Sequence, residues 1–161
     1  NVESRGLGDV YKRQLIELLV VVAIIGILAA VGVVAYSGYT SGAKKQAAKS
    51  THANVVKYIS AELQKCNLGE TSAMGGKLTC SGKTPTTVIN AAIATDGPFA
   101  DFKNPYVTAD AAVRSGSTTS NGGYVNLATN GSDKVDVKTC FTQDSECSTS
   151  SNVLTKTITI E

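Results

Sequence analysis

Four cysteines are the residues with the most definite chemistry in this 161-residue chain. They are Cys66, Cys80, Cys140 and Cys147, an even set without a Cys-x-x-Cys spacing, and the single histidine, His52, has no second ligand spaced near it. This pattern favours two disulfides formed in an oxidising compartment over a zinc site. Four cysteines allow three connectivities, and we predict nearest-neighbour pairing, Cys66–Cys80 and Cys140–Cys147. We expect His52 to be structural or exposed.

Oxygen-bearing side chains in the C-terminal third could contribute to a calcium site, which needs six to eight oxygen ligands. Their spacing matches no EF-hand, so we interpret them as solvated turn residues: Asn130, Asp133, Asp136, Asp144 and Glu146. The sequence contains no nucleophile elbow, phosphate-binding glycine loop or metal-binding histidine cluster. We therefore expect no enzymatic activity, no metal, no cofactor and no small-molecule substrate.

Charge adds little, because the formal net charge of +2 and the isoelectric point near 8.4 are close to balance. Neither value indicates a nucleic acid or an acidic substrate as a direct ligand. The length suits one domain with one long appendage.

The appendage is an apolar run in which every residue from Leu18 to Tyr36 is apolar, Gly or Tyr. As a helix, these roughly nineteen positions span about 28 Å, close to the thickness of a bilayer core and longer than the apolar part of a signal peptide. Glu17 stands at the start of the run. Its carboxylate either pairs with a cation when buried or lies solvated at the headgroup boundary.

The remaining elements predict an α+β head in which the helix continues and packs on a small antiparallel sheet of three to four strands. The helix shows an apolar stripe and stops at Asn67–Gly69. A short helix is predicted over Pro85–Thr95. Asn130-Gly131 predicts a hairpin turn between two strands, and this role also explains the glycosylation acceptor pattern that it forms with Ser132. The stripe residues are Tyr39, Ala43, Ala47, Val55, Ile59 and Leu63; the strands are 124–129, 134–141 and 153–160.

Residues 15–31, LIELLVVVAIIGILAAV, resemble the N-terminal segment of type IV pilins and of type II secretion pseudopilins. The resemblance covers about a tenth of the chain and implies a structural filament subunit. It implies that Glu17 neutralises the N-terminal amine of a neighbouring subunit during filament assembly. The implied partners are identical or related pilin subunits, the inner membrane, the prepilin peptidase and the pilus assembly machinery.

The chain departs from that family pattern at two places. The family is cleaved after Gly and leaves a methylated Phe, but the aligned positions here are Lys12, Arg13 and Gln14, so the processing site is not intact. We interpret residues 1–14 as a leader-like or spurious segment. The helix-breaking Pro of many members is also missing, which leaves Gly26 and Gly32 as the weak points of the helix.

We accordingly divide the chain into residues 1–14, a transmembrane and filament-core segment, 15–36, and a globular head, 37–161. The favoured function is a type IV pilus subunit, held in the bacterial inner membrane with its head outside the cytoplasm and extracellular after assembly. A type II secretion pseudopilin, a minor pilin and a single-pass membrane-anchored binding module are the alternatives.

The expected membrane orientation conflicts with one signal, since positive charge favours the cytoplasmic side and three lysines, Lys44, Lys45 and Lys49, follow the apolar run. Cysteine usage and the resemblance both support a head outside the cytoplasm.

Overall fold

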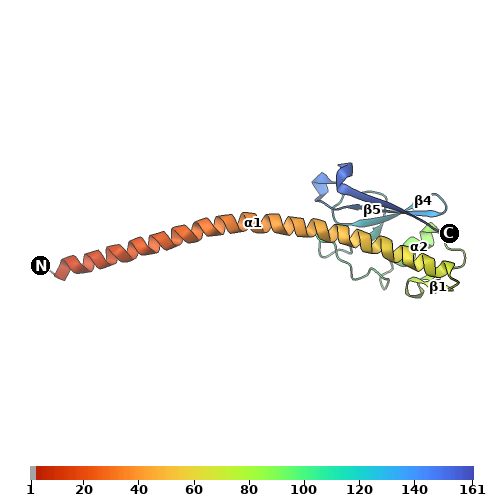
Figure 1. Ribbon diagram of the computed structural model, residues 1–161, viewed down its shortest axis with the longest axis horizontal. Coiled ribbons are helices and arrows are strands. Elements are labelled where there is room, and N and C mark those ends of the chain that lie inside the picture. The colour runs from red at the N-terminus through yellow and green to blue at the C-terminus, as the bar shows by residue number, and fades with distance from the viewer. Residues whose placement is uncertain (1–2) are drawn as a thin grey trace. The chain divides into compact units, whose positions relative to one another are not determined.

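The computed structural model describes residues 3–161, and its first element, helix α1, runs from Glu3 to Asn67. The chain forms two compact units, one ending at Ser41 and one comprising Gly42–Glu161. Helix α1 contributes to both, and the second unit adds a sheet and a short helix (Figure 1). The α+β class is therefore confirmed.

Helix α1 ends through a Schellman motif at the predicted stop. Gly69 adopts a φ of +98°, which lets the Glu70 amide donate to the Lys65 carbonyl and the Gly69 amide donate to the Cys66 carbonyl. These bonds satisfy carbonyls that the last helical turn leaves without intrahelical partners. The prediction that the helix stops at Asn67–Gly69 is confirmed.

The main sheet has the strand order β3-β4-β5-β6. Strands β4 and β5 are joined by the predicted hairpin, with Gly131 at a φ of +71°, and the pairs β4–β5 and β5–β6 are antiparallel. The expectation of a single antiparallel sheet is wrong in two respects, because β3 pairs parallel to β4 and because the head has a second, two-stranded sheet. The bounds are Val113–Ser115 for β3, Val125–Asn130 for β4, Lys134–Cys140 for β5 and Val153–Thr159 for β6.

Two smaller elements complete the head. A second sheet pairs β1, Ser72–Ala73, with β2, Leu78–Thr79, around the 3-10 turn η1, Met74–Gly76. Helix α2, Pro85–Ala92, starts with Pro in its first turn and a capping box between Thr84 and Thr87. The predicted short helix is thus confirmed, although it ends three residues earlier. Two further 3-10 turns are η2, Asp144–Glu146, and η3, Ser150–Asn152.

The core of the head lies between α1 and the inner face of the sheet. Val55, Ile59 and Leu63 face a cluster from α2 and the strands that includes Val88, Val125, Leu127, Val135, Val137 and Ile158. The second half of the predicted stripe faces this core, whereas its first half does not: Tyr39, Ala43 and Ala47 are exposed, and Ala48 and His52 are buried. The reason is geometric: steps of four residues drift about 40° around an α-helix, so Tyr39 and Val55 lie about 160° apart.

A polar clasp, formed by the hydrogen bonds of the Asn104 side chain, holds two loops of the head together. Asn104 is fully buried; its side-chain amide donates to the Gly122 carbonyl, and its side-chain oxygen accepts from the amides of Tyr106 and Val107. Gly122 leaves no room for a side chain, because a Cβ there would lie 2.0 Å from the Thr142 carbonyl oxygen. The clasp therefore requires Gly at position 122.

We predict that Gly122→Ala lowers the free energy of unfolding of the head by about 2 kcal/mol or more, because backbone must move to admit the methyl group. The matched control is Gly42→Ala, which meets nothing within 4 Å in α1 and is expected to raise stability by up to about 1 kcal/mol. Denaturant titration of the full chain in detergent, followed by near-ultraviolet circular dichroism, measures both. Equal stabilities for the two variants would contradict the account.

Candidate functional site

The most extensive candidate interaction surface is the apolar part of α1. Between Leu15 and Tyr36 the large apolar side chains are 49% to 72% exposed. The most apolar 18-residue window of this helix has a mean hydropathy of 3.1, so it is long and apolar enough to cross a membrane. An exposed apolar surface of this extent marks a site that lipid or protein covers.

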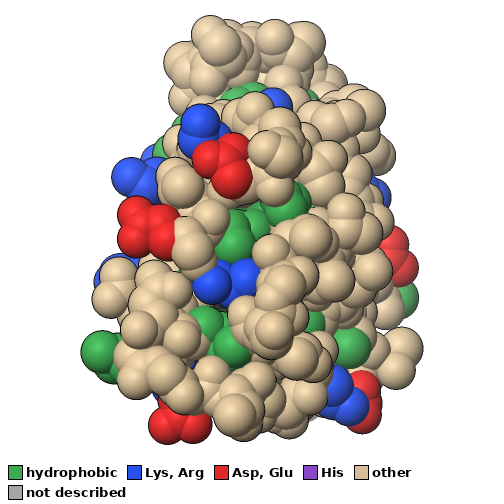
Figure 2. All heavy atoms as spheres, turned by 90° about the vertical axis from the view of Figure 1, so that its right-hand side faces the viewer, with side chains coloured by type: hydrophobic (Ala, Val, Ile, Leu, Met, Phe, Trp, Pro, Cys, Tyr) green, Lys and Arg blue, Asp and Glu red, His purple; other side chains and the backbone are tan. Residues whose placement is uncertain are grey.

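The surface of the head has a different character. Among the described residues of Gly42–Glu161, the large apolar side chains exposed to solvent are Leu68 and Val107. Figure 2 shows one end of the head, where backbone and uncharged side chains cover most of the surface and Lys, Arg, Asp and Glu lie among smaller apolar areas. A surface of this kind suits water. The head is therefore suited to water, whereas the apolar segment is suited to lipid or to contact with protein.

Glu17 lies in α1 at the beginning of the apolar segment, where its Oε1 is 3.2 Å from Arg13 Nε. Both side chains are exposed, and an exposed pair of this spacing contributes only about 0.3–0.5 kcal/mol. Lys12 and Gln14 are also exposed on α1. The structure therefore provides Glu17 with one weak partner, which belongs to the segment that we interpret as leader-like or spurious.

Gly26 and Gly32 both lie within α1, which remains helical through them. Neither has any atom within 4 Å of a Cβ built at its position. Their behaviour in a filament stays a prediction.

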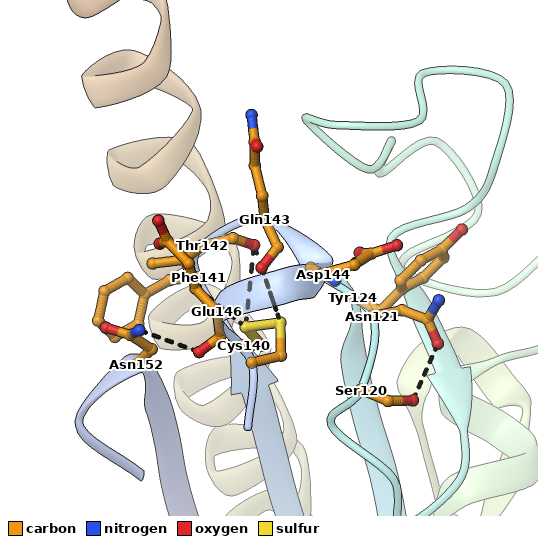
Figure 3. Close-up of a disulfide and its surroundings, with 12 residues drawn as sticks. Ser120, Asn121, Tyr124, Cys140, Phe141, Thr142, Gln143, Asp144, Glu146 and Asn152 are labelled. Atoms are coloured by element: carbon orange, nitrogen blue, oxygen red, sulfur yellow. Dashed lines mark hydrogen bonds between the residues drawn. A yellow bond between two sulfur atoms is a disulfide. The ribbon is translucent and has the colours of Figure 1, made fainter. Parts of the chain in front are cut away.

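The structure contains the disulfides Cys66–Cys80 and Cys140–Cys147, the same pairing that the sequence suggested. Three contacts hold the loop closed by Cys140–Cys147, whose Phe141, Asp144 and Glu146 are labelled in Figure 3. Tyr106 donates to the Phe141 carbonyl at 2.9 Å, Asp144 accepts from the Gly122 amide at 2.6 Å, and Glu146 lies 3.7 Å from Lys45 of α1. The loop is thus a rigid part of the head.

The oxygen-bearing residues considered as calcium ligands make separate contacts in the head. Asp136 accepts from Asn130 at 3.0 Å and from Thr157 at 2.7 Å, whereas Asp144 and Glu146 belong to the disulfide loop. Within residues 3–161, no group of three His, Cys, Asp or Glu side chains is placed to hold a metal ion. An open cleft of about 480 Å³ beside the disulfide loop is lined by Lys44, Tyr106, Val107, Gln143, Asp144 and Ser145.

His52 is buried between α1 and β5, where its Nδ1 lies 2.9 Å from Thr139 Oγ1. The sequence predicts either a structural or an exposed histidine at this position, because no second ligand is spaced near it. Burial lowers the pKa of His52, since removal from water disfavours the charged imidazolium. The structural role is therefore the one that the fold supports.

No protein-family model, curated protein or solved structure matches this chain. The chain's main functional features are an exposed apolar segment of α1, the Glu17 carboxylate at the start of that segment and a polar, disulfide-closed head.

We predict that the head loses stability as the pH falls from 7 to 5. Because the pKa of His52 in the folded state lies below the unfolded value of about 6.5, its contribution is complete above that value and is lost as the pH falls toward the folded pKa. No other histidine is present. Denaturant titrations at several pH values measure how the free energy of unfolding depends on pH, and His52→Asn is expected to weaken that dependence. If the stability of the unmodified chain does not change between pH 7 and 5, His52 does not cause a pH dependence.

Proposed function

We propose that this chain is a structural subunit of a type IV pilus filament, held in the inner membrane by its apolar helix before assembly. The observation that carries the proposal is the long, exposed apolar surface of α1 with a single carboxylate, Glu17, at its start. In the assembled state, copies of this helix would cover one another. The family resemblance of residues 15–31 supports the same conclusion.

The transfer of the apolar helix from the membrane into a filament explains why the Glu17 carboxylate matters. Moving an apolar helix from lipid into a bundle of similar helices gains little hydrophobic free energy, because lipid tails are as apolar as the side chains. Association then depends on packing and on polar pairs. A carboxylate in such surroundings costs several kcal/mol unless a cation compensates it. Pairing between Glu17 and the amine of a neighbour would therefore fix the axial register of each incoming subunit.

The head would form the outer surface of the filament. Its two disulfides fit a location outside the cytoplasm, where oxidising conditions maintain them. The partners under this proposal are copies of the chain or related subunits, together with a prepilin peptidase and an assembly machinery. A pseudopilin, a minor pilin and a membrane-anchored binding module share the apolar helix, and assembly experiments distinguish them.

We predict that Glu17→Gln reduces incorporation into filaments by at least about tenfold, equivalent to about 1.4 kcal/mol, while the head remains folded. Glu70→Gln, which removes an exposed carboxylate at the end of α1, is the matched control and should assemble normally. Quantification of filaments sheared from cells, normalised to membrane-bound subunit, measures the effect. Abundant filaments from the Glu17 variant would refute the role assigned to this carboxylate.

A second prediction concerns the helix inside the filament. Gly26 and Gly32 each cost about 1 kcal/mol relative to Ala in a helix interior, so stretching or melting of α1 is expected between them. A filament density map tests this directly, with a Gly26→Ala, Gly32→Ala double variant as the comparison. Unbroken helix through this segment in the unmodified filament would show that the glycines are not weak points.

A further inference from the structure

The two disulfides differ in their exposure to solvent. Cys140 is 0% and Cys147 is 3% exposed, whereas Cys66 and Cys80 are only partly buried at the edge of the core. Thiol–disulfide exchange requires a thiolate to reach a sulfur atom, so access controls its rate. We propose that Cys66–Cys80 is a site of exchange with an external dithiol, and that Cys140–Cys147 is closed to the same reagent.

The surroundings of Cys140–Cys147 obstruct a thiolate in a second way. Thr142 Oγ1 lies 3.3 Å from Cys140 Sγ, and the Gln143 carbonyl oxygen lies 3.4 Å from Cys147 Sγ (Figure 3). Sulfur in a disulfide carries no hydrogen, so the Thr142 hydroxyl can only donate to Cys140 Sγ, whereas the Gln143 carbonyl brings an electron-rich oxygen to Cys147 Sγ. An incoming thiolate would have to displace both contacts and the packed loop, and the Gln143 carbonyl oxygen would repel its negative charge.

The charges near Cys66–Cys80 favour the opposite behaviour. Lys83 Nζ lies 3.5 Å from the side-chain oxygen of Asn67, the residue that follows Cys66. Lys65, directly before Cys66, is paired with Glu62 and does not add free positive charge. The Lys83 ammonium thus places a positive charge beside the residue that follows Cys66, where it attracts an anionic thiolate against the opposing charge of Glu70.

The exchange proceeds in two steps with a balanced transfer of electrons. One thiolate of the dithiol attacks one protein sulfur, forms a mixed disulfide and releases the other cysteine as a thiolate, which takes a proton from water. The second thiol of the reagent, after losing its proton, attacks the mixed disulfide and releases the remaining cysteine. The dithiol is oxidised to a disulfide, and Cys66 and Cys80 gain two electrons and two protons.

Contacts other than the disulfide hold the loop between Cys66 and Cys80 in place. Glu62 accepts from the Met74 amide, and Lys77 pairs with Asp96. Met74 and Leu78 from this loop are each 1% exposed within the core. The reduced head therefore keeps its fold, and the exchange is reversible.

The test uses the full chain in detergent with dithiothreitol under native conditions, followed by quenching, alkylation and peptide mass spectrometry. Cys66 and Cys80 are expected to become labelled at least about tenfold faster than Cys140 and Cys147. Equal rates, or earlier labelling of Cys140 and Cys147, would overturn the proposal. In 6 M guanidinium the difference should disappear; if it persists, the selectivity does not come from the folded structure and the proposal fails.

A variant pair tests the contribution of charge. Lys83→Gln should slow labelling of Cys66 and Cys80 by about twofold or more by weakening thiolate attraction. Lys134→Gln removes an exposed lysine from β5 and should leave the rate unchanged. Equal labelling rates of Cys66 and Cys80 in the two variants would show that Lys83 does not attract the thiolate.

Discussion

The rest of the structure depends on one constraint, which is that the apolar segment of α1 cannot remain in water. About nineteen consecutive positions offer no charged side chain, and within the described residues their large side chains stay exposed. Lipid can cover this surface when the chain is alone, and copies of the same helix can cover it in an assembly. Because the two environments are nearly equal for apolar groups, the choice between them falls to packing and to the single carboxylate, Glu17.

The head meets a different constraint, since it must be stable with few large apolar residues. Its core uses one face of α1, the inner face of the four-stranded sheet and α2. Two disulfides and the hydrogen bonds of Asn104 fix loops of the head, and the loop between Cys66 and Cys80 also contributes Met74 and Leu78 to this core. The two disulfides differ in exposure. Cys140–Cys147 is buried by the loop that it closes, whereas Cys66–Cys80 is only partly buried at the edge of the core. The head thus combines a buried core and a buried disulfide with a second disulfide, Cys66–Cys80, that a reagent in solution can reach.

Sequence analysis predicts the parts of this architecture that local signals determine. Asn130-Gly131 specifies the hairpin because both residues tolerate positive φ, and Pro85 and Gly69 mark a helix start and a helix end. The parallel strand β3 has only three residues, and its partner is chosen by tertiary contacts that no local pattern encodes. The sequence leaves open whether His52 is structural or exposed, because the face of α1 that packs on the sheet is determined by tertiary contacts. The role of Glu17 depends on a second molecule, so a single chain cannot reveal it.

The central claim is that the apolar segment of α1 packs against copies of itself. Cryo-electron microscopy of filaments recovered from cells that express this chain tests it most directly. The account predicts a filament whose core consists of residues 18–36 from neighbouring subunits, with Glu17 beside an amine of the adjacent chain and the heads outside. If the chain is instead found as separate molecules in the membrane under conditions that assemble a control filament, the claim is contradicted, and a membrane-anchored binding module becomes the better description.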